Sequence, residues 1–189
     1  MYVFQPSRFG RRSRSGGYLR RPALQLLVTA MFAASIALVP TAAPADTRAF
    51  DDRQGDVRHG MDIHKVRIHN EQRLVITTRH RRVQPGQIAF YIDTRPATGP
   101  EYAFFAGVGF GTDWAIVRMR NWRVVSDGPR HCPSDYSFSR RTDTVRASIS
   151  RACLDGADRV RVSVKANDQD RGPDWAPGYR RFFPWIAHG

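Results

Sequence analysis

The segment Gly86–Gly111 constrains the fold most, because two apolar runs there flank a polar connection rich in proline and glycine. In the first run Ile88, Phe90 and Ile92 share one phase of a period-two pattern, which is typical of a β-strand. The intervening phase is also apolar, whereas a strand with one solvated face would carry polar residues at every second position. Two packed layers therefore cover these strands. We predict an all-β, antiparallel two-sheet sandwich of the jelly-roll kind.

The first 45 residues have the pattern of a signal peptide. Six arginines and no acidic residue precede an apolar run over residues 23–39, and Ala43 and Ala45 supply the small side chains of a cleavage site. A membrane anchor is the alternative, but the run is short for a bilayer span and ends at Pro40. We expect cleavage after Ala45, export by the Sec or twin-arginine route, and a secreted or cell-wall-associated protein with no membrane span.

The charge of the chain belongs in part to this leader. The sequence holds 30 basic and 17 acidic residues, for +13, and without the six leader arginines the balance is 24 minus 17, or +7. The remaining arginines are scattered along the sequence, which favours a solvated surface over a nucleic-acid site. The remaining length, 189 minus 45 or 144 residues, is that of one domain, residues 46–189.

Two cysteines, Cys132 and Cys153, are the only ones in the chain. An even count in an exported protein favours one disulfide over a metal site. Each cysteine shares the parity of the apolar residues in its own segment, so we expect both to lie on the apolar face of extended strands. Such a bridge is structural.

Period-two alternation of apolar residues, in segments bounded by turn-forming residues, predicts the other strands. Strands are expected at residues 62–70, 73–83, 87–93, 101–108, 114–119, 122–125, 145–149 and 160–165. The aromatic tail after Asp174 is expected to form a last strand or a cover, and residues 46–60 are expected to be poor in strand.

Acidic residues gather in that first segment. Asp51, Asp52 and Asp56 surround Gly55, a composition that turns select for themselves and that could also supply oxygens to calcium. The turn interpretation is favoured because the spacing matches no known calcium loop. Histidines nearby do not suggest a metal site, since His64 and His69 differ in parity and point to opposite faces of a strand.

Several motifs carry a resemblance: DDRQGDVRHGMDIHKVRIHN, YIDTRPATGPEY, SRACL, RVRVSV and DWAP. With them the chain resembles exported, uncharacterised β-sandwich proteins of high-GC Gram-positive bacteria. More distantly it is similar to family 9 carbohydrate-binding modules and DOMON-like domains. The resemblance implies a role for Asp93 beside the acids of the first segment in holding calcium. Arg95 departs from the pattern where a second acid is expected, and no haem ligand set carries over.

Three functions follow from these observations. The leading one is a non-enzymatic binding or envelope-associated module, with a cell-envelope glycan or a surface protein as its partner. Tyr102, Trp114, Trp122 and Trp175 are the candidates for stacking on a sugar, although aromatic residues more often pack in cores. A hydrolase of envelope polysaccharide would need a carboxyl pair such as Asp93 with Glu101 or Asp113. A structural protein-interaction domain without a small ligand is the third.

Overall fold

The computed structural model describes residues 46–57, 60–109, 111, 113–168 and 172–189. The predicted signal peptide lies outside these residues. The strands are β1 (Asp46–Asp51), β2 (Ile63–Asn70), β3 (Arg73–His80), β4 (Gly86–Asp93), β5 (Tyr102–Val108), β6 (Trp114–Arg120), β7 (Arg123–Pro129), β8 (Ser134–Ser139), β9 (Thr144–Ser150), β10 (Arg159–Asp168), β11 (Asp174–Ala176) and β12 (Ile186–Ala187). A short 3₁₀-helix, η1 (Arg151–Leu154), follows β9.

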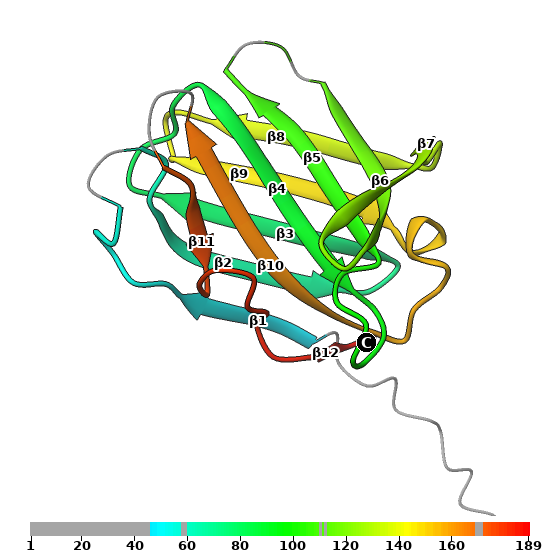
Figure 1. Cartoon of the computed structure of the whole chain (residues 1–189). Helices are drawn as coiled ribbons and strands as arrows, with labels where there is room; N and C mark the ends of the chain where they lie inside the picture. The colour runs from blue at the N-terminus through cyan, green and yellow to red at the C-terminus, as the bar shows by residue number, and fades with distance from the viewer. Residues whose placement is uncertain (1–45, 58–59, 110, 112, 169–171) are drawn as a thin grey trace, which may run out of the picture. The chain divides into compact units, whose positions relative to one another are not determined.

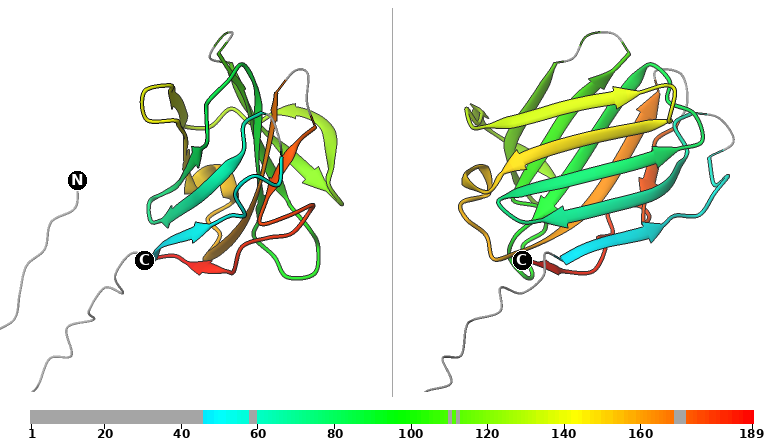
Figure 2. Two further views of the ribbon diagram at one scale, coloured as in Figure 1. Left: turned by 90° about the vertical axis from the view of Figure 1, so that its left-hand side faces the viewer. Right: turned by 180° about the vertical axis from the view of Figure 1, so that it is seen from behind.

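These strands form two antiparallel sheets, as the sequence predicts (Figure 1). The smaller sheet has the order β1-β2-β3-β9-β8, and the larger has the order β11-β10-β4-β5-β6-β7, with β12 pairing to one end of β10. Figure 2 shows the two sheets as facing layers, with the strands of one crossing those of the other. The two-sheet sandwich with one disulfide is thus confirmed.

The main core lies between the sheets and follows the period-two pattern. Phe90 and Phe104, from neighbouring strands, are fully buried and contact each other at a centroid distance of 6.1 Å. The opposite faces of β4 and β5 are covered as well, because Ala89, Tyr91 and Ala103 belong to a second apolar cluster. The expectation that both faces are buried is confirmed, and aromatic residues from the C-terminal tail help to cover the outer face.

Several local expectations were wrong. Residues 46–51, expected to lack a strand, form β1, which pairs with β2 from Asp46↔Asn70 to Asp51↔Lys65. Phe50 is its only large apolar residue, so an edge strand of this kind leaves little alternation to detect. Residues 127–129, expected to turn, continue β7. Gly189 lies beside the start of β1, because its N–H donates to the Asn70 carbonyl at 3.1 Å.

The Cys132–Cys153 disulfide is present, but neither cysteine lies in a strand. Cys132 precedes β8 and is half-buried, whereas Cys153 lies in η1 and is fully buried. The expectation that both cysteines lie in extended strands was wrong, because Ser150 caps a helical turn that contains Cys153. In the part of the chain that the structure describes, no helix has the length and apolar character needed to cross a bilayer.

Candidate functional site

The outer face of the larger sheet carries an aromatic layer, here called the aromatic face. Its members come from β4, from the β6–β7 turn, from β11 and from the tail: Tyr91, Trp122, Trp175, Tyr179 and Phe182. Strand pairing brings them together, since β10 lies between β4 and β11, with Ser163 opposite Tyr91 and Lys165 opposite Trp175. Because side chains alternate between the two faces of a strand, the rings of Tyr91 and Trp175 both point away from the main core.

The rings form one continuous set of contacts. Trp175 stacks on Tyr91 with a centroid distance of 5.4 Å and an interplanar angle of 12°. Trp122 meets Tyr91 at 5.1 Å, Trp175 at 5.9 Å and Phe182 at 5.1 Å. Tyr91 is buried at the centre, and burial raises the pKa of its phenol, so it stays neutral. Trp122 and Trp175 are half-buried.

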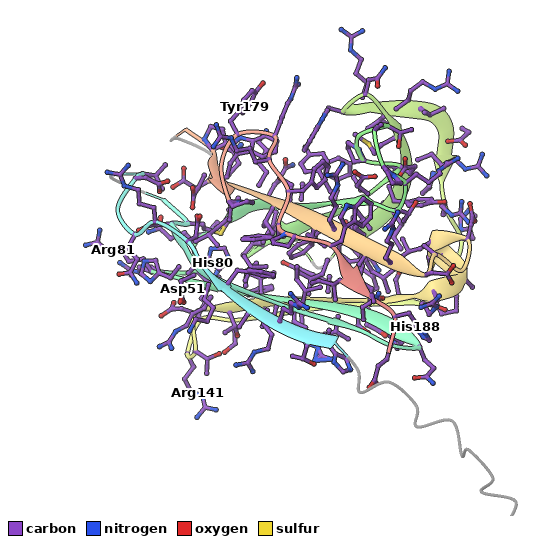
Figure 3. All side chains as sticks on the ribbon, turned by 90° about the horizontal axis from the view of Figure 1, so that it is seen from below. Asp51, His80, Arg81, Arg141, Tyr179 and His188 are labelled. Atoms are coloured by element: carbon purple, nitrogen blue, oxygen red, sulfur yellow. A yellow bond between two sulfur atoms is a disulfide. The ribbon has the colours of Figure 1, made fainter. Side chains whose placement is uncertain are left out.

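Cationic side chains lie over this face. Arg180 stands 5.8 Å from the Trp122 ring and 5.2 Å from the Tyr179 ring, and Lys165 stands 5.6 Å from Trp175. Such cation–π contacts contribute about 0.5–1 kcal/mol each at exposed sites. Tyr179 is the most accessible ring, with 66% of its surface exposed. Figure 3 shows it projecting beyond β10, on the side of the molecule opposite Arg141.

Trp122 is held by an unusual backbone. Asn121 and Trp122 have φ values of +49° and +65° in the turn between β6 and β7. Positive φ at both central residues is the requirement of a type I′ hairpin turn, and asparagine and glycine meet it best. A bulky residue there is uncommon and costs about 1 kcal/mol or more. The ring contacts of Trp122 with the aromatic face offset this cost.

The four predicted stacking residues thus fall in three places. Trp122 and Trp175 lie together on the aromatic face. Trp114 is 40% exposed but lies elsewhere: its ring contacts Tyr136, and its indole N–H donates to the Ser134 hydroxyl at 3.2 Å. Tyr102 is 3% exposed, its hydroxyl donates to Asp155 at 2.6 Å, and Arg130 lies over its ring.

A second feature, here called the acidic cluster, joins Asp52 and Asp56 of the β1–β2 connection with Asp174 of β11. Carboxylate oxygens of these three residues lie within 4.8 Å of one another. Burial, followed by the charge of Asp174, raises the pKa of Asp52 to about 7. Burial also raises the pKa of Asp174 to about 6, with further contributions from Asp56 and Asp62.

The other acids of the predicted metal set lie apart from this cluster. Asp51 is exposed and pairs with Lys65 at 3.1 Å. Asp93 is fully buried at the far end of β4, where it accepts hydrogen bonds from Arg161 Nε at 2.6 Å and from the Arg95 backbone at 3.1 Å. The structure therefore brings together Asp52 and Asp56 from that set and adds Asp174.

Asp93 and Glu101 are two buried acids on either side of the β4–β5 connection. Glu101 Oε2 accepts from the Thr94 N–H at 2.7 Å and from the Thr94 hydroxyl at 3.1 Å. Burial raises the pKa of Asp93, whereas hydrogen bonds from Thr94 and Thr98 outweigh burial and lower that of Glu101. Both carboxylates accept hydrogen bonds from the β4–β5 connection, Asp93 from the Arg95 N–H and Glu101 from Thr94 and Thr98. The pair therefore fixes that connection.

A third feature is a basic depression of about 880 Å³ beside the β3–β4 connection. Arg81 and Arg82 line it together with Arg140 from the β8–β9 turn. Among the described residues, none of these three arginines forms an ion pair. Arg140 is far from Arg81 and Arg82 in the sequence, and only the fold brings the two turns that carry them to one end of the sandwich.

Sequence reasoning also missed Tyr91, Tyr179 and Phe182 as members of one face with Trp122 and Trp175. The only signal was the density of aromatic residues in the tail, and it does not reveal which strand they cover. Comparison of the chain with protein-family models, with curated proteins and with solved structures found no match.

Proposed function

We propose that this chain is an exported, non-catalytic binding module of the cell envelope, and that its aromatic face stacks on the sugar rings of a glycan. The observation that carries the proposal is the pair Trp122 and Trp175, two half-buried residues whose rings are in contact above one sheet, with the exposed Tyr179 beside them. The signal-peptide pattern and the resemblance to carbohydrate-binding modules support the same class of partner.

The chemistry of the face suits a sugar ligand. Flat rings present apolar surface to the C–H groups of a pyranose, while Arg180 and Lys165 at the rim can donate hydrogen bonds to hydroxyl or carboxylate groups. The positive φ of Trp122, which is unfavourable for a bulky residue, also supports a role for Trp122 in ligand binding, since strained backbone conformations cluster at ligand-binding sites.

The test is binding of the purified protein to a panel of neutral and anionic cell-wall polysaccharides, followed by titration calorimetry with the oligosaccharide that binds best. Tyr179→Ala is the first variant, because its exposed ring contributes little to packing. We expect its Kd to rise about 5- to 10-fold, which corresponds to about 1–1.4 kcal/mol. Trp175→Ala should weaken binding further.

Trp114→Ala is the matched control, since it removes an exposed indole that lies outside the aromatic face. It should leave Kd unchanged. Equal weakening by Trp114→Ala and Tyr179→Ala would refute the assignment of the face, and no binding to any polysaccharide would favour the protein-interaction alternative. Circular dichroism of each variant confirms that the fold is retained.

The basic depression favours a second candidate, an anionic wall polymer held by Arg81, Arg82 and Arg140. Its phosphate or carboxylate groups would match the guanidinium groups in charge and geometry. Arg82→Ala with Arg140→Ala should then abolish binding to anionic polymers, whereas Tyr179→Ala should not. The hydrolase alternative gains no support from the Asp93–Glu101 pair.

A further inference from the structure

The outer face of the smaller sheet is polar and carries several arginines. Along β2, β3 and β9, alternation turns the apolar side chains into the main core and turns their neighbours outward. Arg67, Arg79 and Arg146 occupy outward positions and are exposed. In the right-hand view of Figure 2 this sheet lies in front, and none of the described segments covers it. A partner can therefore approach these side chains directly.

The register of the strands spreads the three arginines over an area. Arg67 of β2 and Arg146 of β9 both lie opposite Thr77 of β3, one on each side. Arg79 lies two residues further along β3. With strands about 4.8 Å apart and a rise of about 3.4 Å per residue, their Cα atoms form a triangle with sides of about 8–10 Å. The charges therefore occupy a surface and not a single line.

No acid on the neighbouring strands neutralises these arginines. Strands β2, β3 and β9 contain no aspartate or glutamate. The acids beside them pair with other side chains: Asp51 with Lys65 at 3.1 Å, Glu71 with His69 at 3.1 Å and Asp135 with Arg73 at 2.7 Å. Within the described residues, Arg67, Arg79 and Arg146 form no ion pair. Their positive charge is thus available to an outside partner.

The positive charge continues at one end of the sheet. Arg81, which follows β3, lines a hollow of about 430 Å³ together with Arg79, and it also lines the basic depression. Asp143 lines both hollows, but it is half-buried and its Oδ1 accepts from the Val83 N–H at 3.0 Å. We call the six exposed arginines of this continuous surface the basic face: Arg67, Arg79, Arg81, Arg140, Arg141 and Arg146.

We propose that the basic face docks the molecule on the surface of an anionic phospholipid bilayer. Guanidinium groups match phosphate in charge and geometry, and a two-dimensional set of them matches the plane of the lipid phosphates. A linear polymer would be contacted along one row or groove. In β3, β8 and β9, all of whose residues the structure describes, no outward position carries an aromatic ring, so single-stranded nucleic acid finds no surface for base stacking.

Docking in this way would orient the sandwich. The basic face belongs to the smaller sheet, whereas the aromatic face lies on the outer side of the larger sheet. Figure 3 shows Arg141 and Tyr179 projecting on opposite sides of the molecule. A bilayer against the basic face would therefore leave the aromatic face in solvent. The docking goes beyond the proposed function and does not depend on it.

The test is co-sedimentation of residues 46–189 with vesicles made of equal parts phosphatidylglycerol and phosphatidylcholine, and with vesicles of phosphatidylcholine alone. These residues contain both sheets, the main core and the disulfide, and they lack the predicted signal peptide, which would bind lipid itself. We expect binding to the anionic vesicles only. It should weaken steeply between about 0.1 M and about 1 M salt, as the Debye length falls from about 10 Å to about 3 Å.

The diagnostic variant replaces Arg67, Arg79 and Arg146 by glutamine. All three side chains are exposed and form no ion pair with the described residues, so their loss should spare the fold. Each arginine near an anionic surface should change the apparent Kd for the vesicles about 5-fold, which corresponds to about 1 kcal/mol. The triple variant should therefore bind about 100-fold more weakly.

The matched control replaces Arg120, Arg123 and Arg181 by glutamine. These exposed arginines belong to β6, β7 and the tail, and they form no ion pair with the described residues. The control removes the same net charge from the side of the larger sheet, so it should change the Kd for the vesicles little. Tyr179→Ala should leave that Kd unchanged.

Three results would overturn the proposal. One is equal binding to anionic and neutral vesicles, or binding to neither. Another is equal weakening by the two triple variants, which would mean that net charge alone attracts the protein. The third is tighter binding, at equal phosphate concentration, to soluble polyphosphate or to DNA than to the anionic vesicles, which would assign the basic face to a polymer. No glycan is present in this assay, so failure of the proposed function would leave its result intact.

Discussion

His80 makes the stability of the sandwich depend on pH in a direction that the structure fixes. It lies at the end of β3 with 2% of its surface exposed. Its Nδ1 lies 3.2 Å from the Met61 carbonyl and its Nε2 lies 2.8 Å from the Thr78 hydroxyl. A ring that donates from Nδ1 to the carbonyl satisfies the first contact, while the Thr78 hydroxyl lies between Nε2 and the Val145 carbonyl, to which it donates at 3.4 Å. Burial of the ring away from water disfavours its charged form.

The magnitude follows from the pKa. Burial, which outweighs the hydrogen bond to Met61, lowers the pKa of His80 from its ordinary 6.5 to about 4. Between these values the unfolded chain binds more protons than the folded one, so stability falls as the pH falls from 6.5 to 4. A difference of about 2.5 in pKa, at 1.36 kcal/mol each, amounts to about 3 kcal/mol.

The assay compares urea unfolding of the unmodified protein and of His80→Gln, in chelator, at pH values from 4 to 7. The glutamine side chain has no titrating group. Asp52 and Asp174 change stability in the opposite direction over the same range, because their pKa values are raised, but they do so in both proteins. The difference between the two free energies of unfolding isolates His80, and it should fall by about 3 kcal/mol from pH 7 to pH 4.

A difference that stays constant across this range would refute the reasoning, since it would mean that His80 titrates alike in the folded and unfolded chains. A difference that rises on acidification would mean that the folded structure stabilises the imidazolium, against the burial described above.

Two further predictions concern stability. Replacing both Cys132 and Cys153 by alanine should lower the free energy of unfolding by about 3 kcal/mol, because the disulfide closes a loop with a sequence separation of 21. Urea unfolding of the reduced and the oxidised protein should show the same difference in free energy. Gly86→Ala should lower the free energy of unfolding by about 2–4 kcal/mol, since a Cβ there would lie 2.2 Å from a backbone oxygen of β10. Gly172→Ala is the control: Gly172 has open space around it, so this variant should change the unfolding midpoint little. Equal midpoints for the two alanine variants would contradict the packing at Gly86.

The sequence predicted those parts of the fold that depend on alternation within one segment. The strands from β2 to β6 and β10 were found in this way, because their inward residues are large and apolar. The β1 strand was not predicted, since Phe50 is its only large apolar residue. The turn at Trp122 was not predicted either, because tryptophan rarely adopts a positive φ.

The candidate sites depend on pairings between distant segments, which one sequence does not reveal. Trp175 meets Tyr91 only because β10 pairs with both β4 and β11. Asp174 meets Ile63 from 111 residues away. The individual acids and aromatic residues were recognisable as candidates, but their grouping required the register of the sheets.

Residues 46 and 189 lie close together, because both contact Asn70. Asp46 pairs with Asn70, and the Gly189 N–H donates to the Asn70 carbonyl at 3.1 Å. A short glycine-rich linker could therefore join residue 189 to residue 46, and the chain could be reopened at an exposed turn such as Arg140–Arg141. Such a circular permutant would place a surface tether or a fluorescent fusion at the β8–β9 turn, away from residues 46 and 189, while preserving the strand pairings described above.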